Sequence, residues 1–138
     1  MKTIYKSKFS EHLYDDATAT IYSDWFKETE SMNEEDFRTE MQEWVNAFEA
    51  CKPKYLFDRC VDFSYPISPE EQVWMAKLLN PAWVALGLQK YAHIVPEELF
   101  SEVSVEQTFE EFFNMKLPNQ YPIVNFSNKE EALEWLYD

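Results

Sequence analysis

The sequence contains a single glycine in 138 residues, and this scarcity excludes several classes of nucleotide-binding protein. Loops that hold phosphate groups need repeated glycines, because the backbone must approach the ligand closely. Neither a P-loop nor the G-x-G-x-x-G fingerprint of dinucleotide-binding domains can be formed with one glycine. We therefore expect no function that depends on such a loop.

Basic residues are also scarce, with 12 Lys and Arg against 26 Asp and Glu and a net charge of −14. Nucleic acids and anionic membrane surfaces bind clustered Lys and Arg, so we expect neither as a partner. The longest apolar stretch, Val73 to Leu88, is interrupted by Lys77, Asn80 and Pro81 and predicts no membrane span. No basic segment followed by an apolar one opens the chain, which predicts a cytoplasmic protein.

Cysteine and histidine are equally rare. Cys51 and Cys60 are too few for a disulfide framework, and we interpret them as reduced thiols. His12 and His93 are the only histidines, and no H-x-x-x-H or C-x-x-C spacing occurs. A zinc site would need ligands from distant segments, so the sequence predicts no metal and no cofactor.

Apolar residues, by contrast, are abundant. They make up 46% of the chain, with 11 Phe, 8 Tyr and 5 Trp, which is enough for one hydrophobic core. The length fits one domain over residues 1–138, and no repeat or flexible linker divides it.

Hydrophobic periodicity predicts alternating strands and helices. Two-residue alternation and short apolar runs indicate strands over residues 3–13, 17–25, 55–58, 91–95 and 123–126. Apolar stripes at three- and four-residue spacing, with their caps, indicate helices from Asn33, Ser68, Ser104 and Ser127. Pro81 is expected to open a second helical piece after Leu79, ending at Gly87. The order β-β-α-β-α-β-α-β-α predicts an α/β domain: a mixed β-sheet with an N-terminal antiparallel hairpin and helices packed on it.

Several of these segments carry a resemblance to a known family. They are the hairpin with Trp25, the strand Tyr55–Asp58, the Ser68-capped helix with Trp74, the strand Tyr91–Pro96 and the ending Phe126–Leu136. Together they resemble the SpoIIAA-like family of small bacterial proteins, which has the STAS-type fold of anti-sigma-factor antagonists. The resemblance implies a non-enzymatic regulatory or protein-interaction domain.

The best understood members of that family are switched by phosphorylation of a serine at the start of the helix after the central strand. Ser68 is the nearest equivalent here. It follows Ile67 and precedes Pro69-Glu70, where the family has Asp before the serine and Gly-Leu after it. We interpret Ser68 first as a helix cap, with a phosphosite as the alternative.

The loop after the strand Tyr55–Asp58 is a candidate binding surface, because ligands of open α/β sheets bind at the carboxyl ends of the strands. Its candidate residues are Asp58, Arg59, Cys60, Ser64 and Ser68. Cys60 would be a thiolate if Arg59 lowered its pKa. The alternative is a solvated loop with an ion pair. We expect no catalytic residues, since an enzyme would need Asp58, Cys60 and His93 to converge in space.

The segment 73–88 is apolar around much of a helix. Its candidate residues for an interface or groove are Trp74, Met75, Leu78, Leu79, Trp83 and Leu86. If exposed, they predict a homodimer or another protein partner. The main alternative function is a carrier or sensor of a small apolar molecule, such as a lipid, bound beneath these helices. The third interpretation is that the helix is buried on both sides.

Overall fold

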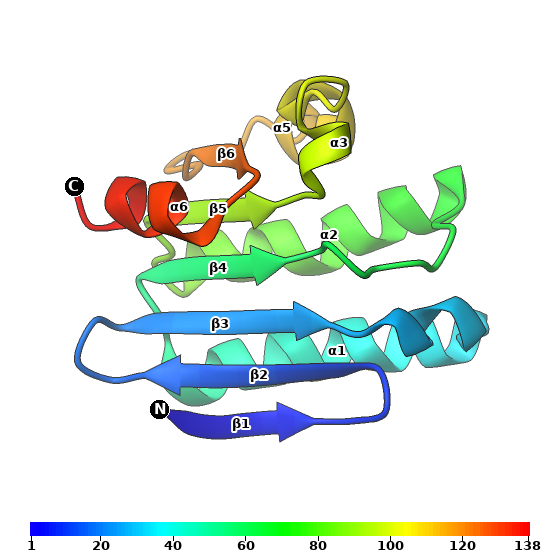
Figure 1. The fold of residues 1–138 in the computed structure, drawn as a ribbon, viewed down its shortest axis with the longest axis horizontal. Helices are drawn as coiled ribbons and strands as arrows, with labels where there is room; N and C mark the ends of the chain where they lie inside the picture. Colours follow the sequence, from blue (N-terminus) through cyan, green and yellow to red (C-terminus); the bar gives the residue numbers. More distant parts are fainter.

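The computed structural model describes all residues from Met1 to Asp138 as one mixed β-sheet with helices on both faces (Figure 1). The six strands are β1 (Lys2–Lys6), β2 (Ser10–Asp15), β3 (Thr20–Trp25), β4 (Tyr55–Arg59), β5 (Lys90–Ile94) and β6 (Ile123–Phe126). They lie in the order β1-β2-β3-β4-β5-β6. The first two pairings are antiparallel and the last three are parallel. This confirms the predicted α/β class with an antiparallel N-terminal part.

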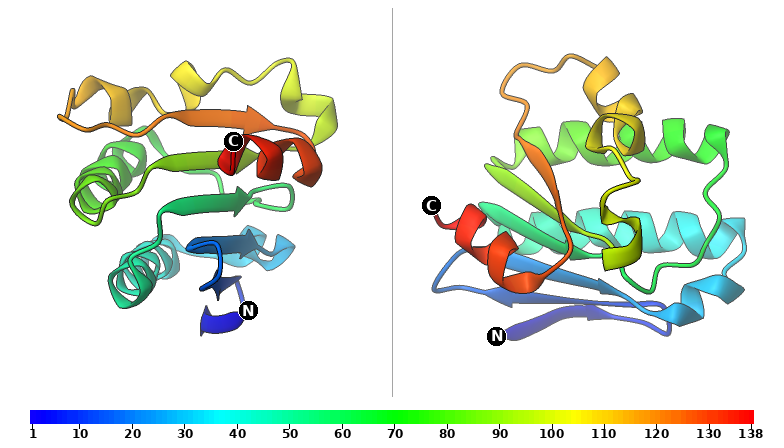
Figure 2. Two further views of the ribbon diagram at one scale, coloured as in Figure 1. Left: turned by 90° about the vertical axis from the view of Figure 1, so that its left-hand side faces the viewer. Right: turned by 45° about the horizontal axis from the view of Figure 1, so that its top comes forward.

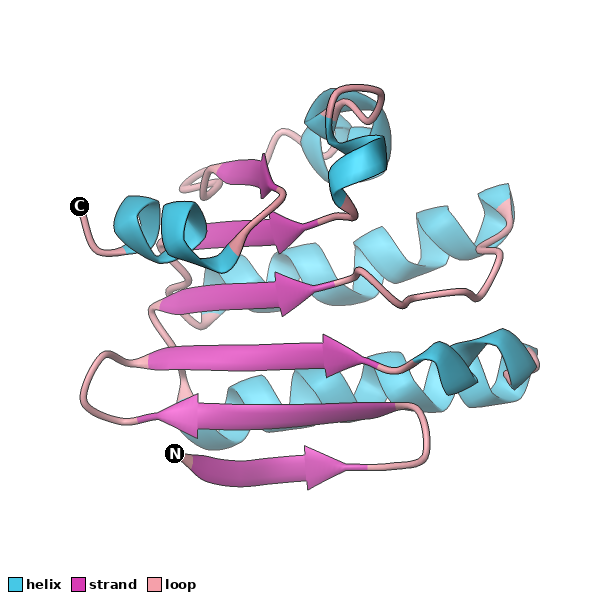
Figure 3. Cartoon of the chain, in the orientation of Figure 1, coloured by secondary structure: helices cyan, strands magenta, loops and turns pink.

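Helices connect the parallel strands, as such pairings require. The connecting helices are η1 (Lys27–Ser31), α1 (Glu34–Cys51), α2 (Pro69–Ala85), α3 (Glu97–Phe100), α4 (Val105–Thr108) and α5 (Glu110–Asn114). A last helix, α6 (Lys129–Leu136), follows β6. The two long helices α1 and α2 lie side by side on one face of the sheet (Figure 3). The short α6 covers the opposite face over β4, β5 and β6 (Figure 2).

The main core lies between the sheet and the helices α1 and α2. Aromatic rings fill it: Phe48 and Trp83 stack with their centroids 3.5 Å apart, and Trp44 meets Trp83 edge-on at 5.4 Å. Both Phe48 and Trp83 are fully buried. A smaller cluster on the other face joins Phe57 and Ala92 of the sheet to Leu136 of α6. The high aromatic content of the sequence is therefore used mainly in packing.

The strand register aligns one polar side chain from every strand. We call this set the polar row, and its members, from β1 to β6, are Tyr5, His12, Ser23, Asp58, His93 and Asn125. Its four central members are buried. All lie on the face toward α1 and α2, because side chains at paired positions share a face. Adjacent members bond at two points, His12 Nδ1 with Ser23 Oγ at 2.7 Å and His93 Nδ1 with Asn125 Oδ1 at 2.9 Å.

Three predicted helix ends are confirmed. Asn33 and Ser68 each form a complete capping box at the start of α1 and α2. Gly87 follows the end of α2 with a φ of +85°, a conformation that glycine adopts without strain.

Two element predictions were wrong, one near the N-terminus and one in the middle of α2. The run 3–13 forms two strands, because the Ser7 hydroxyl accepts hydrogen bonds from the backbone N–H groups of Phe9 and Ser10 and closes a tight turn. The predicted break at Pro81 does not occur, since α2 continues from Pro69 to Ala85. Leu79 and Trp83 on either side of the proline are fully buried, and their packing offsets the lost backbone hydrogen bond.

The C-terminal half also differs in detail. The predicted helix from Ser104 is two short helices, α4 and α5, and an unpredicted α3 precedes them. Ser104 still caps the first of the two, accepting from the Gln107 backbone N–H. The cap of α6 is Asn128 rather than Ser127, because the Asn128 side chain accepts from the Glu131 backbone N–H at 2.9 Å.

Candidate functional site

A cleft of about 380 Å³ opens at the carboxyl ends of the parallel strands. Its walls come from five parts of the chain: the sheet, α1, the loop between β4 and α2, α2 itself and the segment from α3 to α5. Representative wall residues are Trp25, Met41, Met75, Leu99, Phe109 and Phe112. Ligands of open α/β sheets bind at this edge, so the cleft occupies the position expected for a site.

Asp58, Cys60 and His93 form a polar cluster in this mostly apolar cleft. One donor atom from each of the three side chains lies within 4.8 Å of the other two. The sheet produces this convergence, because Asp58 and His93 are register partners on β4 and β5. Cys60 follows β4 directly, and its backbone N–H donates to the Ile94 carbonyl at 2.9 Å.

Asp58 is the only charged side chain that lines the cleft. It is buried, and it accepts hydrogen bonds from Trp25 Nε1 at 2.8 Å and from the Tyr91 hydroxyl. Burial raises the pKa of Asp58, while His93, Tyr91 and Trp25 act in the opposite direction. Burial and the neighbouring Asp58 raise the pKa of Tyr91 well above its usual value. The hydrogen bonds from Trp25 and Tyr91 hold the Asp58 carboxyl group in place.

The orientation of His93 is set by Asn125. The Asn125 Nδ2 group donates to the Val103 carbonyl at 3.2 Å, which fixes the amide and turns Oδ1 toward the histidine. His93 Nδ1 lies 2.9 Å from that oxygen and must carry the proton. In the neutral tautomer, Nε2 is then the ring nitrogen without a proton.

The candidate loop residues divide between the cleft and the surface. Asp58 and Cys60 line the cleft, whereas Arg59, between them on the strand, projects to the other side and pairs with Asp24 at 2.9 Å and Asp62 at 3.1 Å. Burial, followed by Asp58, raises the pKa of Cys60 well above its usual value. The lowered Cys60 pKa considered from the sequence is therefore not found, because Arg59 acts more weakly than burial and Asp58.

The two serines of the loop lie at the surface. Ser64 is exposed, and its hydroxyl donates to the Asp62 carbonyl at 2.9 Å. Ser68 is exposed at the first turn of α2, where its hydroxyl accepts from the Glu71 backbone N–H at 3.1 Å. Both hydroxyls thus have structural partners, and neither lines the cleft.

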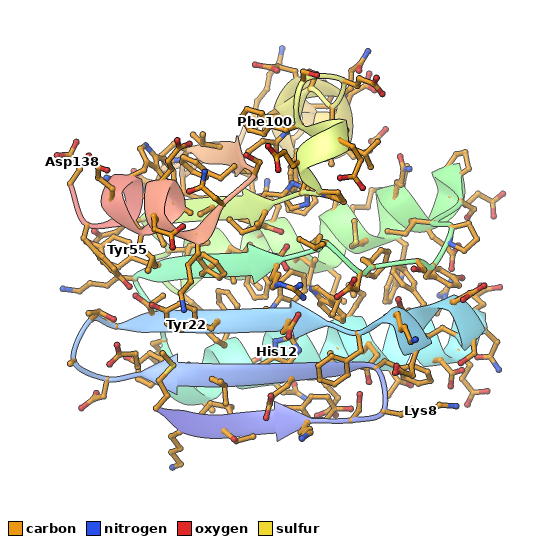
Figure 4. All side chains as sticks on the ribbon, in the orientation of Figure 1. Lys8, His12, Tyr22, Tyr55, Phe100 and Asp138 are labelled. Atoms are coloured by element: carbon orange, nitrogen blue, oxygen red, sulfur yellow. The ribbon has the colours of Figure 1, made fainter.

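The apolar residues of α2 are mostly packed inside the molecule. Leu79 and Trp83 are fully buried, and the partly buried members pack against the main core: Trp74, Met75, Leu78 and Leu86. Met75 and Leu79 line the cleft. Little of this helix is left for a surface patch, and the exposed large apolar side chains lie elsewhere, including Leu99 and Phe100 of α3. Figure 4 labels Phe100 on this short helix.

Sequence reasoning missed several residues of the site, namely Trp25, Tyr91, Asn125 and the wall formed by α3 to α5. The alternation of Tyr91 and His93 places them on one face of a strand. Their convergence with Asp58 follows only from the strand order and register, which the sequence does not provide.

Comparison with protein-family models, with curated proteins and with solved structures finds no match for this chain. The resemblance to the SpoIIAA-like family therefore stays a prediction. No helix of the structure is long and apolar enough to cross a membrane.

Proposed function

We propose that this chain is a non-enzymatic binding protein that carries or senses a small, largely apolar molecule in the cleft. The observation that carries the proposal is the cleft itself, about 380 Å³ in volume and walled by aromatic and aliphatic side chains around one polar cluster. Small-molecule sites typically have volumes of roughly 300–1,000 Å³ and combine apolar walls with a few polar groups that orient the ligand.

The lining also restricts the chemistry of the ligand. No Lys or Arg lines the cleft, and Asp58 is its only charged group. A phosphate or carboxylate would therefore be buried without a cationic partner, which is unfavourable. The best fit is an apolar body with one neutral polar end, such as a hydroxyl or an amide, directed at Asp58 and His93.

A binding role is also favoured over a nucleophilic one. The raised pKa of Cys60 keeps its thiol protonated at neutral pH, and the thiolate is the reactive form of cysteine. Asp58, Cys60 and His93 do converge, as an enzyme would require, but the thiol is in its unreactive form.

Native mass spectrometry of freshly purified protein, together with titration of the neutral fluorophore Nile red, tests the proposal. Two adjacent residues give a matched pair of variants: Leu99 is 42% exposed and lines the cleft, whereas Phe100 is 41% exposed and does not. We expect Leu99→Asp to weaken Nile red binding about ten-fold or more, because it places a charge against the apolar ligand. Phe100→Asp should leave it unchanged. Equal effects of the two variants, or no binding by the wild type, would contradict the proposal.

The second candidate is the regulatory or protein-interaction role that the SpoIIAA-like resemblance implies. It is favoured by one observation: the loop from Asp58 to Ser68 begins in the cleft wall and ends at an exposed serine. A protein partner that contacts this loop would sense whether the cleft is occupied.

Incubation with a serine kinase and mapping of the product tests Ser68 as a phosphosite. Light scattering at high concentration tests the homodimer.

A further inference from the structure

The polar cluster of the cleft combines three kinds of metal-ligand atom. Asp58 offers a carboxylate oxygen, Cys60 a sulfur and His93 a ring nitrogen, all within 4.8 Å of one another. A mixed set of nitrogen, sulfur and oxygen ligands is typical of zinc, whereas magnesium and calcium take oxygen ligands alone.

The surroundings of two of these ligands match the requirements of metal binding. His93 directs Nδ1 to Asn125, so Nε2 is the ring nitrogen left to bind a metal. Metal-binding histidines are commonly oriented by a hydrogen bond of this kind at the other nitrogen. Asp58 is likewise held by Trp25 and Tyr91. Second partners that fix a ligand in place are a regular feature of metal sites.

Charge gives a further, independent argument. The buried Asp58 carboxylate has no Lys or Arg among the residues that line the cleft. A divalent ion bound to one carboxylate, one thiolate and one neutral imidazole would make the site electrically neutral. The Cys60 thiol would release its proton to solvent on binding, because a coordinating thiol is deprotonated.

We infer that Asp58, Cys60 and His93 form a zinc-binding site with three protein ligands at the inner end of the cleft. Tetrahedral zinc places its ligand atoms roughly 3.3–3.8 Å apart, so side-chain rotations that bring the donors about 1 Å closer complete the site. All three residues line the cleft, so a fourth ligand would come from the cleft. Use of this fourth position by the polar end of an organic ligand rests on the proposed function, whereas the metal site itself does not.

Cobalt(II) is the probe for this inference, since it replaces zinc and absorbs visible light. We expect the metal-free chain of residues 1–138 to bind one Co²⁺, with a sulfur-to-cobalt charge-transfer band that excess Zn²⁺ removes. Cys60→Ser should abolish the charge-transfer band. Cys51→Ser is the matched control, because Cys51 is also half-buried but its thiol donates to the Ala47 carbonyl, outside the cleft. It should leave the band unchanged.

Two further measurements keep the test independent of whether the Cys60 variant folds. In the wild type, Zn²⁺ should slow alkylation of Cys60 and leave that of Cys51 unchanged. Asn125→Leu should weaken Co²⁺ binding about 10–100-fold through the loss of histidine orientation. Absence of a saturable band in the wild type, a band that persists in Cys60→Ser, or equal protection of both cysteines would overturn the inference. Nile red binding by the metal-free protein reports separately on the proposed function.

Discussion

Single side chains in this protein have roles that depend on burial, and His12 is the clearest case. It is fully buried in the polar row beside Trp25 and Trp44. Burial lowers its pKa from 6.5 to about 3. The native state therefore keeps His12 neutral at pH values where the unfolded chain protonates it.

This difference predicts a pH dependence of stability. Between pH 6.5 and 3 the unfolded chain binds a proton that the native state does not, so stability falls as the pH decreases. We expect the buried His12 to lower the free energy of unfolding by about 3 kcal/mol at pH 4 relative to pH 7.5. The measurement is urea unfolding at several pH values for the wild type and His12→Asn, which keeps a polar group near Ser23. The carboxylates titrate in both proteins and therefore do not account for a difference between them. If the free energy of unfolding changed with pH in the same way in the wild type and in His12→Asn, the prediction would be contradicted.

Gly87 offers a second test at the residue scale. Its φ of +85° is strained for any residue with a Cβ, while an added Cβ would meet no atom within 4 Å. We expect Gly87→Ala to destabilise the protein by about 1 kcal/mol through backbone strain alone. Gly87→Asn should cost less, because asparagine tolerates this conformation better. Urea unfolding measures both, and an alanine variant as stable as the wild type would contradict the explanation.

At the scale of elements, the start of α2 is held by reciprocal hydrogen bonds. The Ser68 hydroxyl accepts from the Glu71 backbone N–H, and the Glu71 carboxylate accepts from the Ser68 backbone N–H and from the Tyr65 hydroxyl. We expect Ser68→Ala to lower the free energy of unfolding by about 1 kcal/mol. Ser68→Asp keeps a hydrogen-bond acceptor at the cap, so its free energy of unfolding should stay within about 0.3 kcal/mol of the wild-type value. Equal losses in denaturant unfolding would show that the cap is not what Ser68 contributes.

Local patterns explain which elements could be predicted from the sequence. Helices α1 and α2 and strands β4 and β5 have clear periods or apolar runs with recognisable ends, such as Asn33 and Ser68. The turn at Ser7 was missed because the alternation of residues 3–13 continues across it. The segment from α3 to α5 has no sustained period, since each helix in it is only four or five residues long.

The candidate site could be predicted only in part, for a related reason. Asp58 and Cys60 were found from their place after a strand, which is a local feature. Arg59 was grouped with them, although alternation along a strand sends neighbouring side chains to opposite faces. Tyr91 and Asn125 complete the site from strands more than 30 residues further along the chain. Their contribution depends on strand order and register, which are set by the packing of the whole sheet.

At the scale of the whole molecule, the dominant electrostatic feature is the net charge of −14. Like charges repel most strongly in the compact native state, and salt screens this repulsion. We expect the midpoint of thermal unfolding to rise by about 2–5 °C between 0.02 and 0.3 M NaCl. Glycine betaine at equal osmolality is the control, because it is zwitterionic and does not screen charge. A midpoint that falls with NaCl, or rises equally with betaine, would contradict this origin.

The polar row also has a consequence for how the sheet assembles. A slip of one residue between any two strands would turn one part of the row to the opposite face. A slip of β4 against its neighbours would separate Asp58 from Trp25 or Tyr91 and move apolar residues such as Phe57 into the wrong layer. A slip between β5 and β6 would separate His93 from Asn125. The row therefore penalises every incorrect alignment more heavily than an all-apolar face would, because buried polar groups tolerate few alternative partners. Asp58 and His93, which line the cleft, thus also help to give the six strands a single native alignment.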